Sequence, residues 1–242
     1  MSSGTKKILF VVEGANTENN NVGDYAKSLL SLTERDYEIS VYGTTIYDLY
    51  QKMIVDGSYS DVVSFLKDQG KLSLEPGVRS DEAFNSIYLV FDYDPQDHRM
   101  TFDRLIQCAQ FFSDETRKGK LYINFPMFES FWDVVKKDET WALSENEPRE
   151  GLNGDRYKAE VRSRSVFGST LPILGKENLV HVIRLNEDRY HSMLSIGAKA
   201  CWPGTNIPSL VRVQKKNEED SGLIRILNTF CLLVLDYNPD LI

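Results

Sequence analysis

The chain has 242 residues and a formal net charge of −8, and 26% of its residues are charged. This length can hold one large domain, or a domain with an appendage, around a sizeable core. The negative charge argues against a broad, non-specific coating of nucleic acid, because such binding depends on neutralising phosphates, although a local basic groove stays open. No apolar run approaches the ~20 residues of a membrane span and no signal peptide is recognisable, so we expect a cytoplasmic protein with no membrane contact.

The first part of the chain alternates between strand-like and helix-like patterns. Apolar or alternating runs predict strands at 7–12, 37–42, 87–91 and 120–125. Amphipathic spacing predicts helices at 24–32, from Thr44 or Thr45 to 54, after a cap at Ser60, and at 101–112. Pro126 fits the first turn of a further helix that reaches about Lys136. This order predicts an α/β fold with a doubly wound, mostly parallel sheet in residues 1–139.

The pattern changes after Thr140. Residues 145–154 are polar and predict a loop, whereas 177–195 have the spacing of a helix. Pro203 and Pro208 interrupt the pattern, 214–220 resemble a charged linker, and the apolar run 223–235 predicts a terminal helix. We therefore predict a mainly helical C-terminal region at 140–242.

Three cysteines are spread along the chain, at positions 108, 201 and 231. Their separations match no metal-binding pattern, and an odd number does not suggest a disulfide framework. Small core residues are therefore the expected role of Cys108, Cys201 and Cys231.

Two of the predicted strands end abruptly at carboxylates. The run Ile8–Val12 is followed by Glu13-Gly14, and the run Ile87–Phe91 is followed by Asp92-Tyr93-Asp94. In an open parallel sheet the carboxyl ends of the strands face the functional crevice, so Glu13, Asp92 and Asp94 would meet there if the two strands are neighbours. Carboxylates at such close range repel one another unless cations lie between them, and hard oxygen ligands suit Mg²⁺ or Mn²⁺. This pattern predicts metal-dependent chemistry on phosphate.

These motifs resemble those of the TOPRIM domain, and within it the RloB-like and OLD-nuclease-like proteins. That group has a Glu-Gly-x-x-Thr-Glu motif, then Asp-x-Asp, then a segment like Asn-Pro-x-Phe-Glu-x-Trp. Here the three appear as 13–18, 92–94 and 124–132, the last with one residue inserted before Pro126 and one before Trp132. The resemblance covers roughly 6–135 and has no counterpart in 140–242.

The resemblance implies a nuclease that cleaves DNA or RNA, tRNA included, in bacterial defence against phage. Glu13, Asp92 and Asp94 would be the catalytic residues, and Glu18 and Glu129 would join them in holding two Mg²⁺ or Mn²⁺ ions. Glu13 would ligate an ion or act as a general base. The expected partners are the nucleic acid, a partner ATPase of a defence system, and a second copy of the chain.

Basic residues recur in 155–165, where they offer a phosphate-contacting surface for the nucleic acid. The alternative is a solvated helix face. The candidates are Arg156, Lys158, Arg162 and Arg164. Weaker candidates for a role near the acidic motif are Asp97, His98 and Asn124, while the aromatic residues of 125–132 are expected in the core.

Two other classes of function stay open. The first is a non-catalytic regulatory module, in which the acidic residues bind a metal or a partner without turnover. The second is a phosphatase of the haloacid-dehalogenase type, in which Asp92 would be the attacked nucleophile. That family usually carries its Asp-x-Asp motif near the N-terminus, and it leaves Glu13 unexplained.

Overall fold

The computed structural model describes residues 7–15, 17–57, 59–149, 152, 154–168, 174–196 and 202–242, without the side chains of 17–19. Cys201 and the side chain of Glu18 therefore lie outside the described part. The contacts divide the chain into two compact units. Unit 1 comprises Met1–Phe91 and Asp103–Tyr122, and unit 2 comprises Asp92–Phe102 and Ile123–Ile242. Residues 92–102 and 123–139 thus fall in unit 2 by their contacts, and the domain boundary expected near residue 139 stays a prediction.

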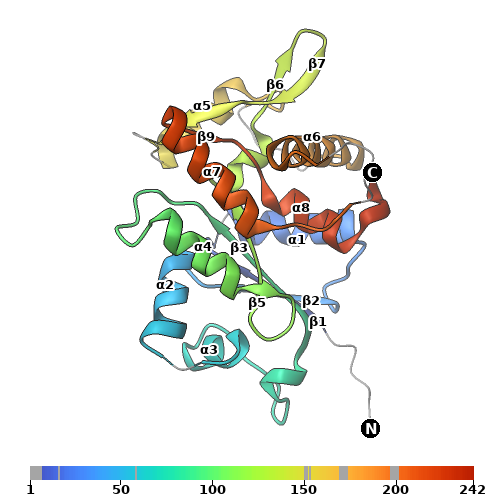
Figure 1. The fold of residues 1–242 in the computed structure, drawn as a ribbon. Coiled ribbons are helices and arrows are strands. Elements are labelled where there is room, and N and C mark those ends of the chain that lie inside the picture. Colours follow the sequence, from blue (N-terminus) through green and yellow to red (C-terminus); the bar gives the residue numbers. More distant parts are fainter. Residues whose placement is uncertain are drawn as a thin grey trace. The chain divides into compact units, whose positions relative to one another are not determined.

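A five-stranded sheet, in the order β2-β1-β3-β5-β4, forms the centre of the α/β fold (Figure 1). Strand β1 pairs in parallel with both β2 and β3, and the two-residue β4 is antiparallel to β5. The strands β1, β3 and β5 are apolar and buried along most of their length, as expected of strands covered on both faces. Their bounds are Lys7–Val12 (β1), Tyr37–Val41 (β2), Phe84–Asp92 (β3), Ser113–Asp114 (β4) and Gly119–Asn124 (β5).

Unit 1 has helical segments against both faces of the sheet. The Tyr37 hydroxyl donates to the Gly23 carbonyl in α1, whereas Ser40, on the opposite face of the same strand, donates to the Lys71 carbonyl that follows α3. The mostly parallel α/β sheet predicted from the sequence is confirmed, and helices on both faces are compatible with double winding. The helices are Thr17–Leu30 (α1), Ile46–Tyr50 (α2) with a π-helical continuation Gln51–Val55, Val62–Asp68 (α3) and Phe102–Phe111 (α4). The α3 cap is Asp61, which accepts from the Ser64 amide, and not Ser60.

In the residues that the structure describes, unit 2 combines four helices with two small antiparallel sheets, β6 with β7 and β8 with β9. The strands are Val134–Lys137 (β6), Thr140–Leu143 (β7), Asn146–Pro148 (β8) and Leu223–Arg225 (β9). The helices are Gly154–Arg164 (α5), Lys176–Leu194 (α6), Ile207–Ser221 (α7) and Thr229–Tyr237 (α8), with 3-10 turns at Phe128–Trp132 and Pro239–Leu241.

The helix expected from Pro126 to about Lys136 is wrong. Phe125 exchanges two backbone hydrogen bonds of 2.9 Å with Leu227, so the chain is still extended where the helix should begin. A short 3-10 turn follows at Phe128–Trp132, and the β-branched pair Val134-Val135 enters the β6–β7 hairpin. Contacts with residues a hundred positions away thus override the local helix signal.

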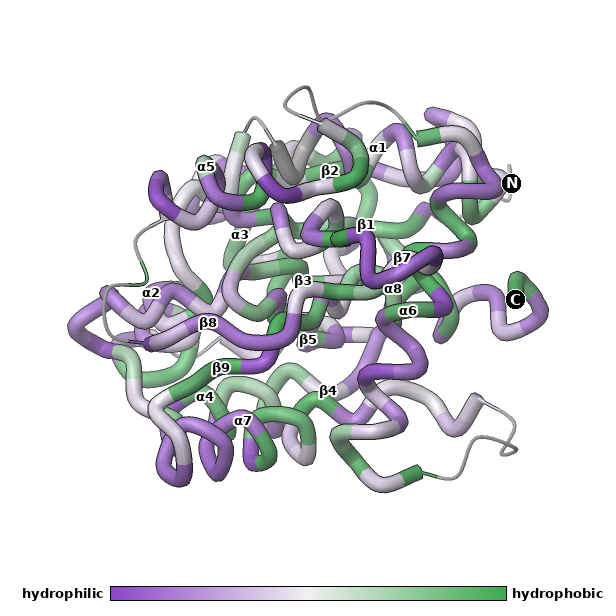
Figure 2. Tube along the Cα trace, turned by 90° about the horizontal axis from the view of Figure 1, so that it is seen from above, coloured by the Kyte–Doolittle hydropathy of each residue, from purple (hydrophilic) through white to green (hydrophobic). Residues whose placement is uncertain are grey.

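Two predictions near the C-terminus are also wrong. Residues 214–220 are not a linker but the second half of α7, and Pro208 lies in the first turn of that helix. Hydrophilic and hydrophobic residues alternate along α7, as its purple and green segments in Figure 2 show. The apolar run 223–235 is not one helix, because its first residues form β9 and α8 begins only at Thr229. Residues 146–148 pair with β9, so the expected loop at 145–154 contains a strand.

Asn206 is the residue whose side chain caps α7. Its Oδ1 accepts a 3.0 Å hydrogen bond from the Ser209 amide, which would otherwise lack a helical partner. We expect Asn206→Ala to lower the free energy of unfolding by about 1 kcal/mol, whereas Asn206→Asp retains the acceptor and most of the stability. Urea denaturation followed by circular dichroism measures both, and equal losses in the two variants would exclude the capping role.

No helix in the described ranges is both long and apolar enough to cross a membrane.

Candidate functional site

The first acidic motif lies at the end of β1. Val12, the last residue of β1, is level with Val41 of β2 and with Val90 of β3 in a parallel register. Glu13 follows it, half-buried, and its carbonyl accepts a 2.9 Å hydrogen bond from the Gly43 amide. The backbone of Glu13 is therefore held at the carboxyl edge of the sheet.

The second acidic motif begins within β3 and leaves it. Asp92 is the last residue of β3, and the amide of Tyr93 is shared between the carbonyls of Asn124 and Pro126, at 3.1 and 3.2 Å. Tyr93 is fully buried and its ring packs on Phe102 and Phe125. The two carboxylates were expected on the same face of one strand, but β3 ends at Asp92 and Asp94 lies beyond it.

Asp94 starts the loop after β3. Its φ of 37° lies in the left-handed region, which aspartate tolerates better than most residues. Its carboxylate accepts from the Gln96 amide at 3.3 Å, and its carbonyl accepts from the Asp97 amide. Burial raises the pKa of the Asp94 carboxyl, and the neighbouring charge of Asp97 adds to that rise. A bound cation would favour the charged form of this carboxyl.

Asp97 and His98 are neighbours in the chain but differ in the exposure of their side chains. The Asp97 side chain is 5% exposed and accepts hydrogen bonds from the Arg99 amide and guanidinium, at 2.7 to 2.9 Å. His98 has an 87% exposed side chain, 3.7 Å from Asp97. Asp97 therefore holds the turn after the acidic motif, while His98 faces solvent.

Asn124 connects the second motif to the start of α8. It is fully buried, and its side-chain amide donates to Asp92 Oδ1 at 3.3 Å. Its carbonyl oxygen accepts from the amides of Thr229 and Phe230, at 3.1 and 3.4 Å, at the first turn of α8. The hydrogen bonds from α8 hold the side-chain oxygen of Asn124 toward the helix and therefore leave its NH₂ group toward Asp92. The NH₂ group in turn donates to the Asp92 carboxylate.

We expect the variant Asn124→Asp to lose about 1–3 kcal/mol of stability, because a carboxylate retains the acceptor for α8 but places a second charge against Asp92. The exchange Asp92→Asn/Asn124→Asp restores one donor and one acceptor, so it should recover much of that loss. Both are measured by urea denaturation. An exchange variant no more stable than Asn124→Asp would contradict the orientation described here.

Glu129 lies in the 3-10 turn after β5, and not in an α-helix as predicted. Its side chain is 3% exposed, and Lys158 of α5 forms an ion pair with it at 3.2 Å. The structure thus brings together two residues that the sequence assigned to separate roles, a metal ligand and a nucleic-acid contact. The charge of Glu129 is balanced within unit 2 by a cation of the chain itself.

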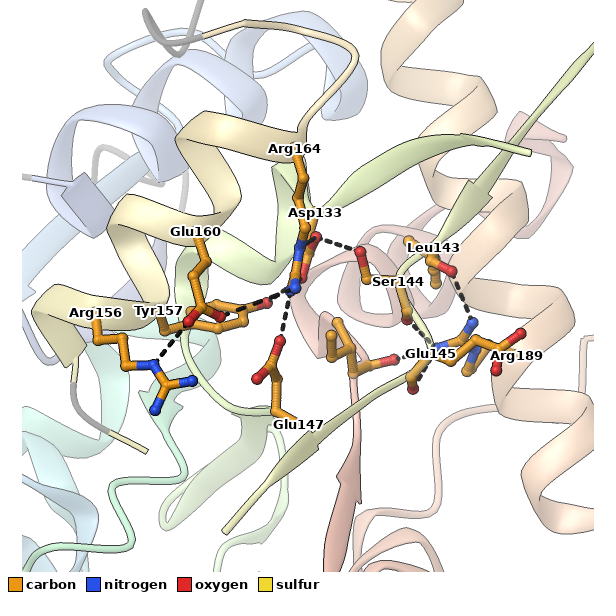
Figure 3. A network of polar contacts seen from close by, with 11 residues as sticks. Asp133, Leu143, Ser144, Glu145, Glu147, Arg156, Tyr157, Glu160, Arg164 and Arg189 are labelled. Carbon is orange, nitrogen blue, oxygen red and sulfur yellow. Dashed lines mark hydrogen bonds and ion pairs between the residues drawn. The ribbon is translucent and has the colours of Figure 1, made fainter. Parts of the chain in front are cut away.

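The other basic residues of α5 differ in their surroundings (Figure 3). Arg156 pairs with Glu160 at 2.7 Å, one turn along the same helix, and Arg162 is exposed. Arg164 bridges Asp133 and Glu147, at 2.6 and 2.7 Å. Burial acts to lower the pKa of Arg164, but its hydrogen bonds and the charges of Asp133 and Glu147 outweigh this and raise it. Arg164 therefore holds unit 2 together, whereas Arg162 is directed to solvent.

Asp133 and Arg189 are key polar residues that the sequence did not single out. Asp133 is fully buried and accepts from Arg164, Tyr157 and Ser144. Arg189 of α6 donates to the carbonyls of residues 143, 144, 145 and 226, which ties the end of β7 and the residues after it to the residue that follows β9. Every one of these partners is at least eleven residues away, so no local motif marks either residue.

In unit 2, Asp92 and Asp94 offer carboxylate oxygens, the donor chemistry that a hard divalent cation prefers, and neither residue is fully exposed. In unit 1, Glu13 offers the same group at the end of β1. Within the ranges that the structure describes, no three or more His, Cys, Asp or Glu side chains are arranged as a complete metal site. The buried Cys108 and Cys231 are core residues, whose thiol pKa burial raises. No protein-family model, curated protein or solved structure matches this chain.

Proposed function

We propose that the chain is a metal-dependent phosphodiesterase, a TOPRIM-type nuclease of the RloB-like group that acts in anti-phage defence. The observation that supports it best is the parallel pairing of β1 with β3, in which Val12 is level with Val90. Each strand then continues into an acidic motif, Glu13-Gly14 and Asp92-Tyr93-Asp94. The ends of adjacent parallel strands are where α/β folds place their functional groups.

In this proposal Asp92 and Asp94 would hold a divalent cation, and Glu13 would serve as a further ligand or as a general base for a water molecule. Glu18 would be an additional ligand. Bound Mg²⁺ or Mn²⁺ would supply Lewis acidity and a more acidic water molecule. The buried amide of Asn124 donates a hydrogen bond to the Asp92 carboxylate, and a bound cation would offset the burial that raises the pKa of Asp94.

In this proposal Lys158 contacts the substrate phosphate. Its pairing with the buried Glu129 fixes the ammonium on α5, which packs on the turn that follows β5. A fixed cation of this kind stabilises charge that develops on a phosphate. Arg162 extends the basic surface, and a partner ATPase or a second copy of the chain would control access to it.

Cleavage of a mixed substrate panel tests the proposal. Plasmid DNA, single-stranded DNA, total RNA and tRNA are incubated with the protein in Mg²⁺, Mn²⁺ or EDTA. A double Asp92→Ala/Asp94→Ala variant, purified in parallel, controls for contaminating nucleases. We expect cleavage of one substrate class that requires the metal and is lost in the variant. Metal binding without cleavage of any substrate would instead support a regulatory module.

A further inference from the structure

Unit 1 contains two adjoining hollows at the opposite end of β3 from Asp92. They measure ≈ 400 and ≈ 220 Å³ and share Asp61, Ser80, Asp81 and Arg117 among their lining residues. Their walls come from the start of α3, the 3-10 turn Ser80–Glu82, the start of β3 and the turn before β5. A 2.9 Å hydrogen bond from the Val62 amide to the Arg117 carbonyl joins two of these walls. We call the pair the α3 pocket.

The larger hollow is suited to an anion. Lys67, Arg79 and Arg117 line it against Asp61 and Asp81, a local excess of positive charge on a chain whose net charge is −8. Asp81 already binds Arg79 through two hydrogen bonds, and Asp61 caps α3.

Lys67 and Arg117 are the cations of this hollow that we assign to a ligand, although the charge of Arg117 also acts on Asp81. Both are exposed and neither forms an ion pair with any residue that the structure describes. The hydroxyls of Ser60, Ser64 and Ser80 line the same hollow and can donate to phosphate oxygens. An ammonium, a guanidinium and hydroxyls together are the usual set of phosphate-binding groups.

The smaller hollow has a different chemistry. Its lining is mixed: Val63, Phe84 and Ile87 contribute apolar atoms, while Asn85 and Asp81 add a carboxamide and a carboxylate. The Phe84 ring can pack on a planar aromatic ring, and an asparagine amide matches the donor and acceptor edge of a base. Two adjoining hollows, one for an anion and one for a flat ring, have the size and the order of groups of a small phosphorylated nucleoside.

We propose that the α3 pocket binds a nucleoside monophosphate, with its phosphate on Lys67 and Arg117 and its base against Phe84. The pocket is separate from the acidic motifs, since Ile87, its lining residue nearest to Asp92 along β3, lies roughly 16 Å before it at 3.3 Å per residue. This inference does not depend on the proposed nuclease activity. A ligand there would be an effector and not a substrate.

Isothermal titration with AMP, GMP, CMP and UMP, in EDTA so that no metal site contributes, tests the pocket. Inorganic phosphate and the unphosphorylated nucleosides are the comparison probes. We expect one nucleotide to bind with a 1:1 stoichiometry and more tightly than either of its parts. Lys67→Ala/Arg117→Ala should weaken it at least about tenfold, as loss of charged hydrogen bonds implies. Arg35→Ala, which removes an exposed arginine elsewhere in unit 1, should leave the affinity unchanged.

Three results would overturn the proposal: no nucleotide binding at about 1 mM; equal affinity for inorganic phosphate; or unchanged affinity in the double variant. Hydrogen–deuterium exchange on the wild-type protein gives a reading that needs no variant. Nucleotide should protect 60–67, 80–87 and 115–118, and protection confined to the acidic motifs would count against the pocket. The double variant Asp92→Ala/Asp94→Ala should bind the nucleotide like wild type, which separates this result from the nuclease test.

Discussion

Asp92→Asn is expected to reduce metal-dependent cleavage about 10³-fold, since loss of a ligand carboxylate removes several kcal/mol of charge stabilisation. The change leaves the side-chain shape intact, and an amide oxygen can still accept the hydrogen bond from Asn124. Stability should therefore stay near that of wild type. Initial rates over a range of Mn²⁺ concentrations measure the effect, and a higher metal requirement would identify Asp92 as a ligand.

Glu13 follows the other strand, β1. The variant Glu13→Gln should reduce the metal-dependent cleavage rate by a similar factor. Asp240→Asn is the matched control, because it removes an exposed carboxylate from the C-terminal 3-10 turn of unit 2. Wild-type cleavage rates in Asp92→Asn or in Glu13→Gln would contradict the proposed catalytic site. The control variant Asp240→Asn should cleave at the wild-type rate.

The second large effect is expected at Asp133. This fully buried carboxylate binds Arg164 through two hydrogen bonds, of 2.8 and 2.6 Å, and also accepts from Tyr157 and Ser144. Asp133→Asn replaces a carboxylate, which only accepts hydrogen bonds, with a carboxamide whose NH₂ group would face the donors of Arg164, Tyr157 or Ser144. It also removes the buried negative charge that pairs with Arg164. We expect a loss of about 3–5 kcal/mol in the free energy of unfolding, as when one member of a buried ion pair is removed.

Tyr157→Phe provides a graded comparison, because it deletes only the hydroxyl that donates to Asp133 at 2.7 Å. Its expected cost is about 1 kcal/mol. Urea denaturation monitored by circular dichroism measures both variants. An Asp133→Asn protein as stable as Tyr157→Phe would mean that the network contributes little to unit 2.

The sequence alone determined the parts of the fold that depend on neighbouring residues. Apolar runs of strand length at 8–12, 87–91 and 120–125 became β1, β3 and β5, because a strand buried on both faces needs continuous apolar residues. The abrupt change to carboxylates at Glu13 and Asp92 was visible for the same reason. Their joint role in binding a metal stays a prediction.

The tertiary structure decided what depends on distant residues. Phe125 is extended because Leu227 pairs with it, and the Asn124 carboxamide is oriented by Thr229. Lys158 forms an ion pair with Glu129, and no pattern of residue spacing along the chain predicts this contact. Local propensities amount to less than about 1 kcal/mol per residue, so a few buried hydrogen bonds to remote segments outweigh them. The sequence therefore indicated which residues end the strands, and only the folded chain determined how the side chains around them are held.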